Sequence, residues 1–386
     1  MDDSRFPCDQ PPANVGDRAE GTVVVTALER RTTKSGQPYA VVTLANATGK
    51  VTVRVWSDRL DEWTDVVPGT PLHVRCTGVS AFPDGLGWSV DDLAVLPSTH
   101  PVAEESVPPC PVALSDLYDR TRALLQRCSQ PALALLHVLL HTPLEWGDGL
   151  LESVAGRWRR WPAAVGHHHA VRHGLWWHSL QVTQAALAMA DVLEADGPVP
   201  LNRDVLIVGG LLHDVGKIDE LRAGGGIGDG GRLATHILWG AVRLQEATTR
   251  AKHAGIEISF EQRRLFDDVL HVCASHHGTV EWGANIRPAS REAWLLHAAD
   301  LASAHVEKGA DAARAGVPIA EHWLQPVGGW ARDAVRVTPP SAHTTDPALA
   351  EQVLASLAPV AAPAAPPVGY TDHLLSFVLP FPLSQE

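Results

Sequence analysis

The sequence lacks the features of secreted, membrane-spanning and zinc-finger proteins. Its five cysteines are scattered, odd in number and form no CxxC pair, so we expect reduced thiols and exclude a zinc finger. Met1 is followed by acidic and polar residues, and no apolar run approaches about 18 residues, so we expect neither a signal peptide nor a transmembrane helix. These absences favour a soluble, cytoplasmic protein.

The sequence also lacks an excess of positive charge. Its net charge of −13 argues against tight binding of duplex nucleic acid through a basic surface. It does not exclude an enzyme whose bound metal ions supply positive charge locally. Tyrosine and phenylalanine are scarce, with 3 and 6 residues against 13 tryptophans. Most tryptophans would fill cores, but exposed ones would suit base stacking.

What the sequence does contain divides into distinct segments. Its 386 residues suit two or three domains, and the 45% hydrophobic content is typical of a globular protein. We expect a loose polar arm over residues 1–15, an OB-fold domain over 16–97, a linker over 98–111, a helical domain over 112–335 and an alanine- and proline-rich C-terminal extension over 336–386.

Residues 16–97 carry five short apolar segments separated by turn residues. Five short strands in roughly 80 residues predict an all-β barrel of the OB type. The predicted strands are Gly21–Leu28, Tyr39–Leu44, Lys50–Trp56, Pro71–Gly78 and Leu86–Val95. The region that follows shows helical periodicity and no convincing strand, so we expect an all-α domain there.

The predicted barrel has candidate nucleic-acid-binding residues. Arg30, Arg31 and Lys34 surround the first hairpin turn, and Trp56 and Trp88 lie on strands. Basic loops and strand-borne aromatic side chains are the usual means by which OB-folds bind single strands. The alternative is that both tryptophans fill the barrel core and the charges belong to a solvated turn. The sequence leaves the two interpretations open.

The most informative stretch is Leu206–Leu221, which reads LIVGGLLHDVGKIDEL. Its apolar run ends in His213 and Asp214. Burying an imidazole beside a carboxylate is costly unless something compensates for the lost hydration, and a metal ion would use both as ligands. A single His-Asp pair also suits a hydrogen-bonded helix end, so the metal hypothesis depends on further ligands elsewhere.

Four other predicted helices supply such ligands. They are Gly174–Leu193 with His178 on its apolar face, Leu233–Thr248 with His236 one turn before Gly240, Gln262–Ser275 leading into His276 and His277, and Arg291–Val306 with His297 and Asp300 facing inward. We expect Gly240 to permit close approach of a neighbour. A histidine taken singly is more often a core residue than a ligand, but this ordered series is hard to explain by coincidence. Mixed imidazole and carboxylate ligands predict Mn, Fe, Co, Ni or Zn, and their number predicts two ions bridged by Asp214.

These stretches carry a family resemblance. HHHAVRHGLWWHSL, LLHDVGKIDEL, THI, ASHHGTVEWGA and EAWLLHAADLASA resemble an HD-domain metal-dependent phosphohydrolase over residues 174–306. Together with GDRAEGTVVVTALERRTTKSGQPY in the barrel, they resemble the YhaM-type 3′→5′ exoribonucleases, which join an OB-fold to an HD domain. The chain departs from the family in RHGLWW before His178, in the glycine-rich loop Gly224–Gly231 and in its C-terminal extension.

The resemblance implies roles for individual residues. One ion, for which Mn²⁺ is the first expectation, would be held by His178, His213, Asp214 and Asp300, and a second by Asp214, His236, His276 and His277. Asp214 and Lys217 are the candidate catalytic residues. Lys217 would lie near the phosphate and hold one of its oxygens as a compact cation, unless it is a surface lysine that caps a helix.

Four further residues are candidates for lining the pocket: His168, His169, Trp282 and His297. His168 and His169 would line the entrance or carry protons, or else lie in a solvated loop. Trp282 would stack a base or pack in the core.

We therefore predict a metal-dependent 3′→5′ exonuclease that degrades single-stranded RNA, with single-stranded DNA also open, to nucleoside 5′-monophosphates. One alternative is an HD-type nucleotide or cyclic-nucleotide phosphohydrolase. Another is a non-catalytic nucleic-acid-binding protein with a vestigial HD site. A homo-oligomer would help a weakly binding barrel hold its strand through multivalency.

Overall fold

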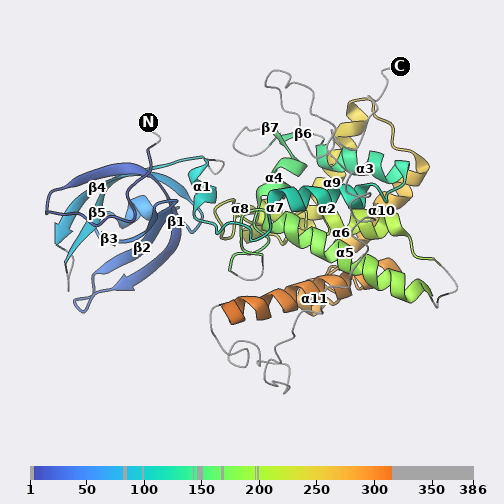
Figure 1. Cartoon of the computed structure of the whole chain (residues 1–386). Helices are drawn as coiled ribbons and strands as arrows, with labels where there is room; N and C mark the ends of the chain where they lie inside the picture. The colour runs from blue at the N-terminus through green and yellow to red at the C-terminus, as the bar shows by residue number, and fades with distance from the viewer. Residues whose placement is uncertain are drawn as a thin grey trace.

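The N-terminal domain is a five-stranded antiparallel barrel (Figure 1). The structure, a computed structural model, describes residues 4–80, 85–97, 100–141, 143–145, 151–166, 169–195, 197 and 200–314. The strands pair in the order β3-β2-β1-β4-β5, and contacts between β3 and β5 close the barrel, which confirms the predicted OB-fold. The strands are β1 (Arg18–Thr32), β2 (Pro38–Asn46), β3 (Gly49–Trp56), β4 (Pro71–Ser80) and β5 (Leu86–Val95).

The first described residues belong to this barrel and differ from the predicted loose arm. Phe6 is fully buried, and the carbonyl of Ser4 accepts a hydrogen bond from the Thr22 amide at 2.8 Å. A side chain at Gly21 would place its Cβ 2.5 Å from the Phe6 nitrogen, so the glycine permits this close approach. The apolar ring of Phe6 belongs to the hydrophobic core of the barrel, where it packs edge-on against Trp88 at 5.6 Å.

The second domain is helical, as predicted, and contains one short hairpin that the sequence analysis missed. The hairpin pairs β6 (Pro143–Glu145) with β7 (Leu151–Ser153). No helix in the described part of the chain is long and apolar enough to span a bilayer. The helices are α1 (Val102–Glu105), α2 (Leu114–Leu125), α3 (Gln130–His141), α4 (Val154–Arg160), α5 (Gly174–Ala195), α6 (Arg203–Leu212), α7 (Lys217–Glu220), α8 (Asp229–Leu233), α9 (His236–His253), α10 (Phe260–Ser275) and α11 (Arg291–Arg314), with 3-10 turns at Leu60–Trp63 and Val280–Trp282.

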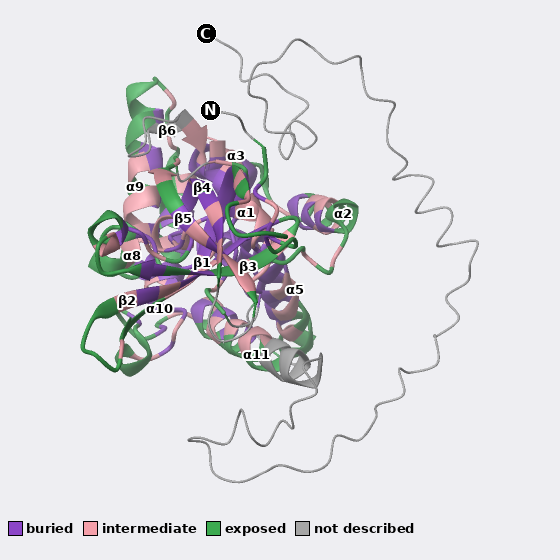
Figure 2. Cartoon of the chain, turned by 90° about the vertical axis from the view of Figure 1, so that its left-hand side faces the viewer, coloured by how far each residue is buried: buried purple, intermediate pink, exposed green. Residues whose placement is uncertain are grey.

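Helix α6 lies at the centre of this domain and positions the site. It begins behind Asn202, whose side-chain oxygen accepts hydrogen bonds from the amides of Asp204 and Val205. Every residue from Val205 to Leu212 is buried, and α5, α10 and α11 pack around the helix. In Figure 2, part of α5 carries the buried colour. The C-terminal end of α6 therefore delivers the residues after Leu212 into the interior of the helical domain.

The barrel contacts the helical domain through the glycine-rich loop noted in the sequence. A Cβ added at Gly226 would lie 2.6 Å from the carbonyl oxygen of Pro68, and one added at Gly69 would lie less than 3.0 Å from that of Gly225. The predicted linker contributes as well, because α1 forms within it and Glu104 pairs with Arg160 of α4 at 2.9 Å. Close backbone packing thus joins the two domains.

Candidate metal centre

Side chains from five helical segments converge on one buried region. They come from α5, the end of α6, the first residue of α9, the end of α10 and α11: His178, His213, Asp214, His236, His276, His277 and Asp300. Two triads each bring three ligand atoms within 4.8 Å of one another. We name the group of His178, His213 and Asp214 the first cluster and the group of His236, His276 and His277 the second cluster.

The first cluster is centred on His178. Its Nε2 lies 3.3 Å from Asp214 Oδ2 and 3.1 Å from Asp300 Oδ1. The Nε2 atoms of His178 and His213 lie 3.3 Å apart. Asp300 therefore lies beside this cluster, in contact with His178.

The second cluster shares Asp214 with the first. The Nε2 atoms of His236 and His277 lie 3.3 Å apart, and Asp214 Oδ1 lies 3.4 Å from His236 Nε2 and 3.5 Å from His276 Nε2. One carboxylate thus directs Oδ2 to the first cluster and Oδ1 to the second. This is the arrangement of a bridging ligand between two ions.

Hydrogen bonds at Nδ1 set the tautomers of these histidines. Backbone carbonyls lie 2.8, 2.9 and 2.9 Å from the Nδ1 atoms of His213, His276 and His277. A carbonyl only accepts, so each Nδ1 carries the proton and each Nε2 presents a lone pair. Among the described residues, the buried Asp214 Oδ1 and His276 Nε2 have no hydrogen-bond donor. Converging lone pairs without donors fit a divalent cation.

The protonation states also suit metal binding. Burial lowers the pKa of His276 to about 4, which keeps the imidazole neutral near pH 7. Burial would raise the pKa of Asp214, but the Lys217 cation holds it well below its usual value. Burial would likewise lower the pKa of Lys217, but the Asp214 carboxylate, 2.6 Å from its Nζ, raises it. The site therefore contains an anionic aspartate beside a cationic lysine.

Glu220 is a site residue that the sequence analysis missed. Its carboxylate accepts a hydrogen bond from His236 Nδ1 at 2.7 Å, which leaves Nε2 facing the second cluster. Glu220 lies one turn after Lys217 in α7, and Arg243 of α9 holds the neighbouring Asp219 through Nε at 2.8 Å. The feature of the sequence that could have indicated Glu220 is its position as an acidic residue shortly after the His213-Asp214 pair.

Replacing Glu220 with glutamine is expected to lower divalent-metal affinity at the second cluster by about 10- to 100-fold, because an amide oxygen is a weaker acceptor and orients His236 less firmly. Metal titration of the purified protein by calorimetry measures the effect. Glu246→Gln, which alters a partly exposed carboxylate paired with Arg243 at 2.7 Å, is the matched control. Equal affinities for the two variants would show that Glu220 does not tune the site.

The remaining candidates of the helical domain are His169, His168 and Gly240. His169 is buried, with its Nε2 2.8 Å from Gln181 Oε1 and its ring 5.0 Å from that of His178, so the solvated-loop alternative is wrong for this residue. His168 lies outside the described residues. The glycine that permits a close approach is Gly216 and not Gly240. A Cβ at Gly216 would lie less than 3.0 Å from the carbonyl oxygen of His236, whereas a Cβ at Gly240 would meet no atom outside its own helix closer than 3.6 Å.

The barrel candidates separate into core and surface residues. Trp88 is 7% exposed and donates from Nε1 to the Gln10 carbonyl at 3.0 Å, so it is a core residue and its assignment to nucleic-acid binding is wrong. Trp56 is 49% exposed and stacks on Tyr39 at 5.5 Å, a partner that the sequence analysis missed. Arg31 lies opposite Tyr39 in the sheet register.

The remaining basic candidates, Arg30 and Lys34, are exposed on the same hairpin, where Arg30 also donates to the Trp63 carbonyl at 3.3 Å. Arg31, Tyr39 and Trp56 thus form a row across β1, β2 and β3, which we name the barrel row.

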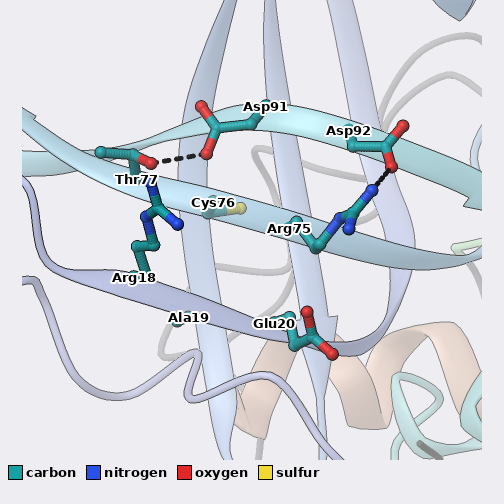
Figure 3. A pocket seen from close by; sticks show the side chains of 8 residues that line it. All are labelled: Arg18, Ala19, Glu20, Arg75, Cys76, Thr77, Asp91 and Asp92. Atoms are coloured by element: carbon teal, nitrogen blue, oxygen red, sulfur yellow. Dashed lines mark hydrogen bonds and ion pairs between the residues drawn. The ribbon is translucent and has the colours of Figure 1, made fainter. Parts of the chain in front are cut away.

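The barrel also has a separate pocket between β1, β4 and β5 (Figure 3). Its charged side chains are largely paired, with Arg75 bonded to Asp92 and the Thr77 hydroxyl donating to Asp91 at 2.5 Å. Three carboxylates face two guanidinium groups across the whole lining, which comprises Arg18, Ala19, Glu20, Arg75, Cys76, Thr77, Asp91 and Asp92. This balance does not favour an anionic strand, so the barrel row is the better candidate surface.

Comparison with known proteins agrees with this geometry. Residues 175–305 match the HD domain family. Three relatives, each named 3′-5′ exoribonuclease YhaM, align along most of the chain. The protein of Oceanobacillus iheyensis is 26% identical over 296 residues, 75% of this chain and 85% of the relative. The corresponding values are 24% over 299 residues (76% and 85%) for Shouchella clausii and 22% over 297 residues (74% and 84%) for Bacillus subtilis. The chain therefore contains an HD domain behind an OB-fold barrel and, over three-quarters of its length, is similar to the YhaM-type exoribonucleases.

Proposed function

We propose that the protein is a metal-dependent 3′→5′ exonuclease that acts in the cytoplasm and degrades single-stranded RNA to nucleoside 5′-monophosphates. The observation that supports it most directly is the pair of clusters sharing Asp214, each with imidazole Nε2 atoms directed inward. The similarity to proteins named exoribonucleases supports the choice of substrate. Single-stranded DNA is a second candidate substrate, and assembly into a homo-oligomer stays a prediction.

The clusters fit two divalent transition-metal ions, with Mn²⁺ as our first choice and Fe, Co, Ni or Zn as alternatives. His178, His213, Asp214 and Asp300 would hold one ion, and Asp214, His236, His276 and His277 the other. When bound, such ions supply a water nucleophile at neutral pH and neutralise charge on the phosphodiester.

The chain's own residues would hold and orient the substrate. Lys217, which stays protonated beside Asp214, binds a non-bridging phosphate oxygen as a compact cation. A new bond would form between water oxygen and phosphorus as the bond between phosphorus and the 3′ oxygen of the penultimate nucleotide breaks. A proton from the water would pass through solvent to that 3′ oxygen, and the released nucleotide would keep its 5′ phosphate. The barrel row would hold the strand upstream by stacking on Trp56 and Tyr39, beside Arg31, whose guanidinium group is paired with Glu29.

The test uses single-stranded RNA and DNA of one sequence, labelled at either end and incubated with the protein and Mn²⁺. We expect a 3′ label to appear at once as a mononucleotide, a 5′ label to pass through a ladder of shortened strands, and EDTA to stop both. EDTA should leave strand binding in place, but weak and salt-sensitive because of the acidic net charge. Internal cuts, or hydrolysis of free nucleotides alone, would contradict the proposal and favour another phosphohydrolase activity.

A further inference from the structure

Three aromatic side chains form a row on the surface next to the second cluster. The rings of Trp282 and His297 lie 6.3 Å apart, and those of His297 and Trp294 lie 5.9 Å apart. Trp282 is 59% exposed and Trp294 is 53% exposed, so the interpretation of Trp282 as a core residue is wrong. Large exposed aromatic groups in one place mark a surface that binds something.

The row is tied to the metal ligands through the backbone. His277 donates from Nδ1 to the carbonyl of Trp282 at 2.9 Å. His297 donates from Nδ1 to the carbonyl of His276 at 2.6 Å. The ring of His297 and the backbone of Trp282 are therefore fixed relative to the second cluster.

Two glycines make this attachment possible. Gly278 has a φ of +82°, and a Cβ there would lie less than 3.0 Å from the His297 ring. Gly283, which follows Trp282, has a φ of +99°, and its Cβ would lie 3.3 Å from His277 Nδ1. A side chain at either glycine would be strained and would crowd a histidine. The stretch from His276 to Gly283 thus builds the second cluster and the aromatic row as one unit.

We propose that Trp282, His297 and Trp294 form a stacking platform for the 3′-terminal bases of a single-stranded nucleic acid. The inference rests on the proposed function, which places the terminal phosphodiester at the metal clusters. Every base has a π-face, so stacking on aromatic side chains holds a strand without selecting its sequence. The platform and the barrel row would then hold the strand at two separate places.

The experiment combines tryptophan variants with strands that lack bases. Trp282→Ala, Trp294→Ala and the double variant are compared on single-stranded RNA with normal or abasic residues at the two 3′-terminal positions. Phe260→Ala is the control, because Phe260 is 76% exposed at the opposite end of α10. Metal content is measured for each variant as a check on the second cluster. It should not change in Trp282→Ala, because the backbone carbonyl that accepts the hydrogen bond from His277 is retained.

We expect each tryptophan variant to weaken binding of the normal strand by about 5- to 150-fold, the loss that corresponds to stacking of one base. KM should rise correspondingly, with kcat and metal content unchanged. On the abasic strand the variants should bind like the wild type, because the partner of the tryptophan is already absent. Phe260→Ala should behave as the wild type throughout.

Wild-type affinity of Trp282→Ala and Trp294→Ala for the normal strand would overturn the platform and would point to a protein partner for the exposed rings. Binding measured in EDTA separates this outcome from failure of the proposed function. A wild type that binds through Trp282 and hydrolyses nothing would refute the exonuclease and leave the platform standing. If the double variant hydrolysed RNA as fast as the wild type at low substrate concentration, the platform alone would be refuted.

Discussion

Replacement of Asp214 by asparagine is expected to lower the rate of RNA hydrolysis by at least about 10³-fold. Loss of a residue that merely orients a ligand costs about 10- to 100-fold in metal affinity. Asp214 contacts ligands of both clusters directly, through Oδ2 at 3.3 Å from His178 Nε2 and Oδ1 at 3.4 Å from His236 Nε2. Asparagine has one oxygen and no charge, so neither ion would keep its shared ligand. Steady-state hydrolysis with Mn²⁺, together with the metal content of the purified variant, measures the effect.

Two further variants test whether the loss of activity in Asp214→Asn comes from its position between the two clusters. Asp300→Asn changes a carboxylate that lies 3.1 Å from His178 Nε2, so we expect it to reduce metal content at the first cluster only. Asp267→Asn changes an exposed carboxylate on α10 and should leave both properties intact. If Asp214→Asn retained full activity, the metal centre would be vestigial and hydrolysis would occur elsewhere.

The barrel was predictable because its strands are short apolar segments separated by turn residues. The roles of particular side chains in the barrel were harder to predict. Trp56 and Trp88 both lie on strands, but Trp56 points outward onto Tyr39, whereas Trp88 meets Phe6 inside the barrel. Phe6 lies far from β5 in sequence, and only the closed barrel brings the two together. Local patterns cannot specify such a contact.

The residues of the two clusters were predictable for a physical reason. A histidine or aspartate on an apolar helix face is costly unless it is paired, so several of them in one domain indicate a common partner. Glu220, Trp294 and Gly216 carry no such anomaly. Glu220 and Gly216 act through contacts with α9, and Trp294 through its ring contact with His297, so their roles depend on how the helices pack.

Gly216 provides the second large prediction, because it lies where α7 and α9 approach most closely. Its φ of −68° is open to any residue, so the constraint is space alone. A Cβ at Gly216 would lie less than 3.0 Å from the carbonyl oxygen of His236 and from the amide nitrogen of Gly240, and these backbone atoms cannot move aside as a flexible side chain would. Alanine should therefore push α9 away and withdraw His236 from the second cluster.

Overpacking of this kind costs about 3 kcal/mol, so Gly216→Ala should lower the Tm of the helical domain by about 6–12 °C and remove most hydrolytic activity. Gly240→Ala is the matched control on the facing helix. Its Cβ would have only ordinary contacts, with the nearest atom 3.6 Å away. Within a helix, alanine is favoured over glycine by up to about 1 kcal/mol, so Gly240→Ala should keep activity and raise the Tm slightly. Opposite shifts of the two melting temperatures, read by calorimetry, would establish that the contact between α7 and α9 positions His236. Equal shifts in Tm for the two variants would show that α9 can move to accommodate a methyl group at Gly216, and that His236 is positioned by Glu220 alone.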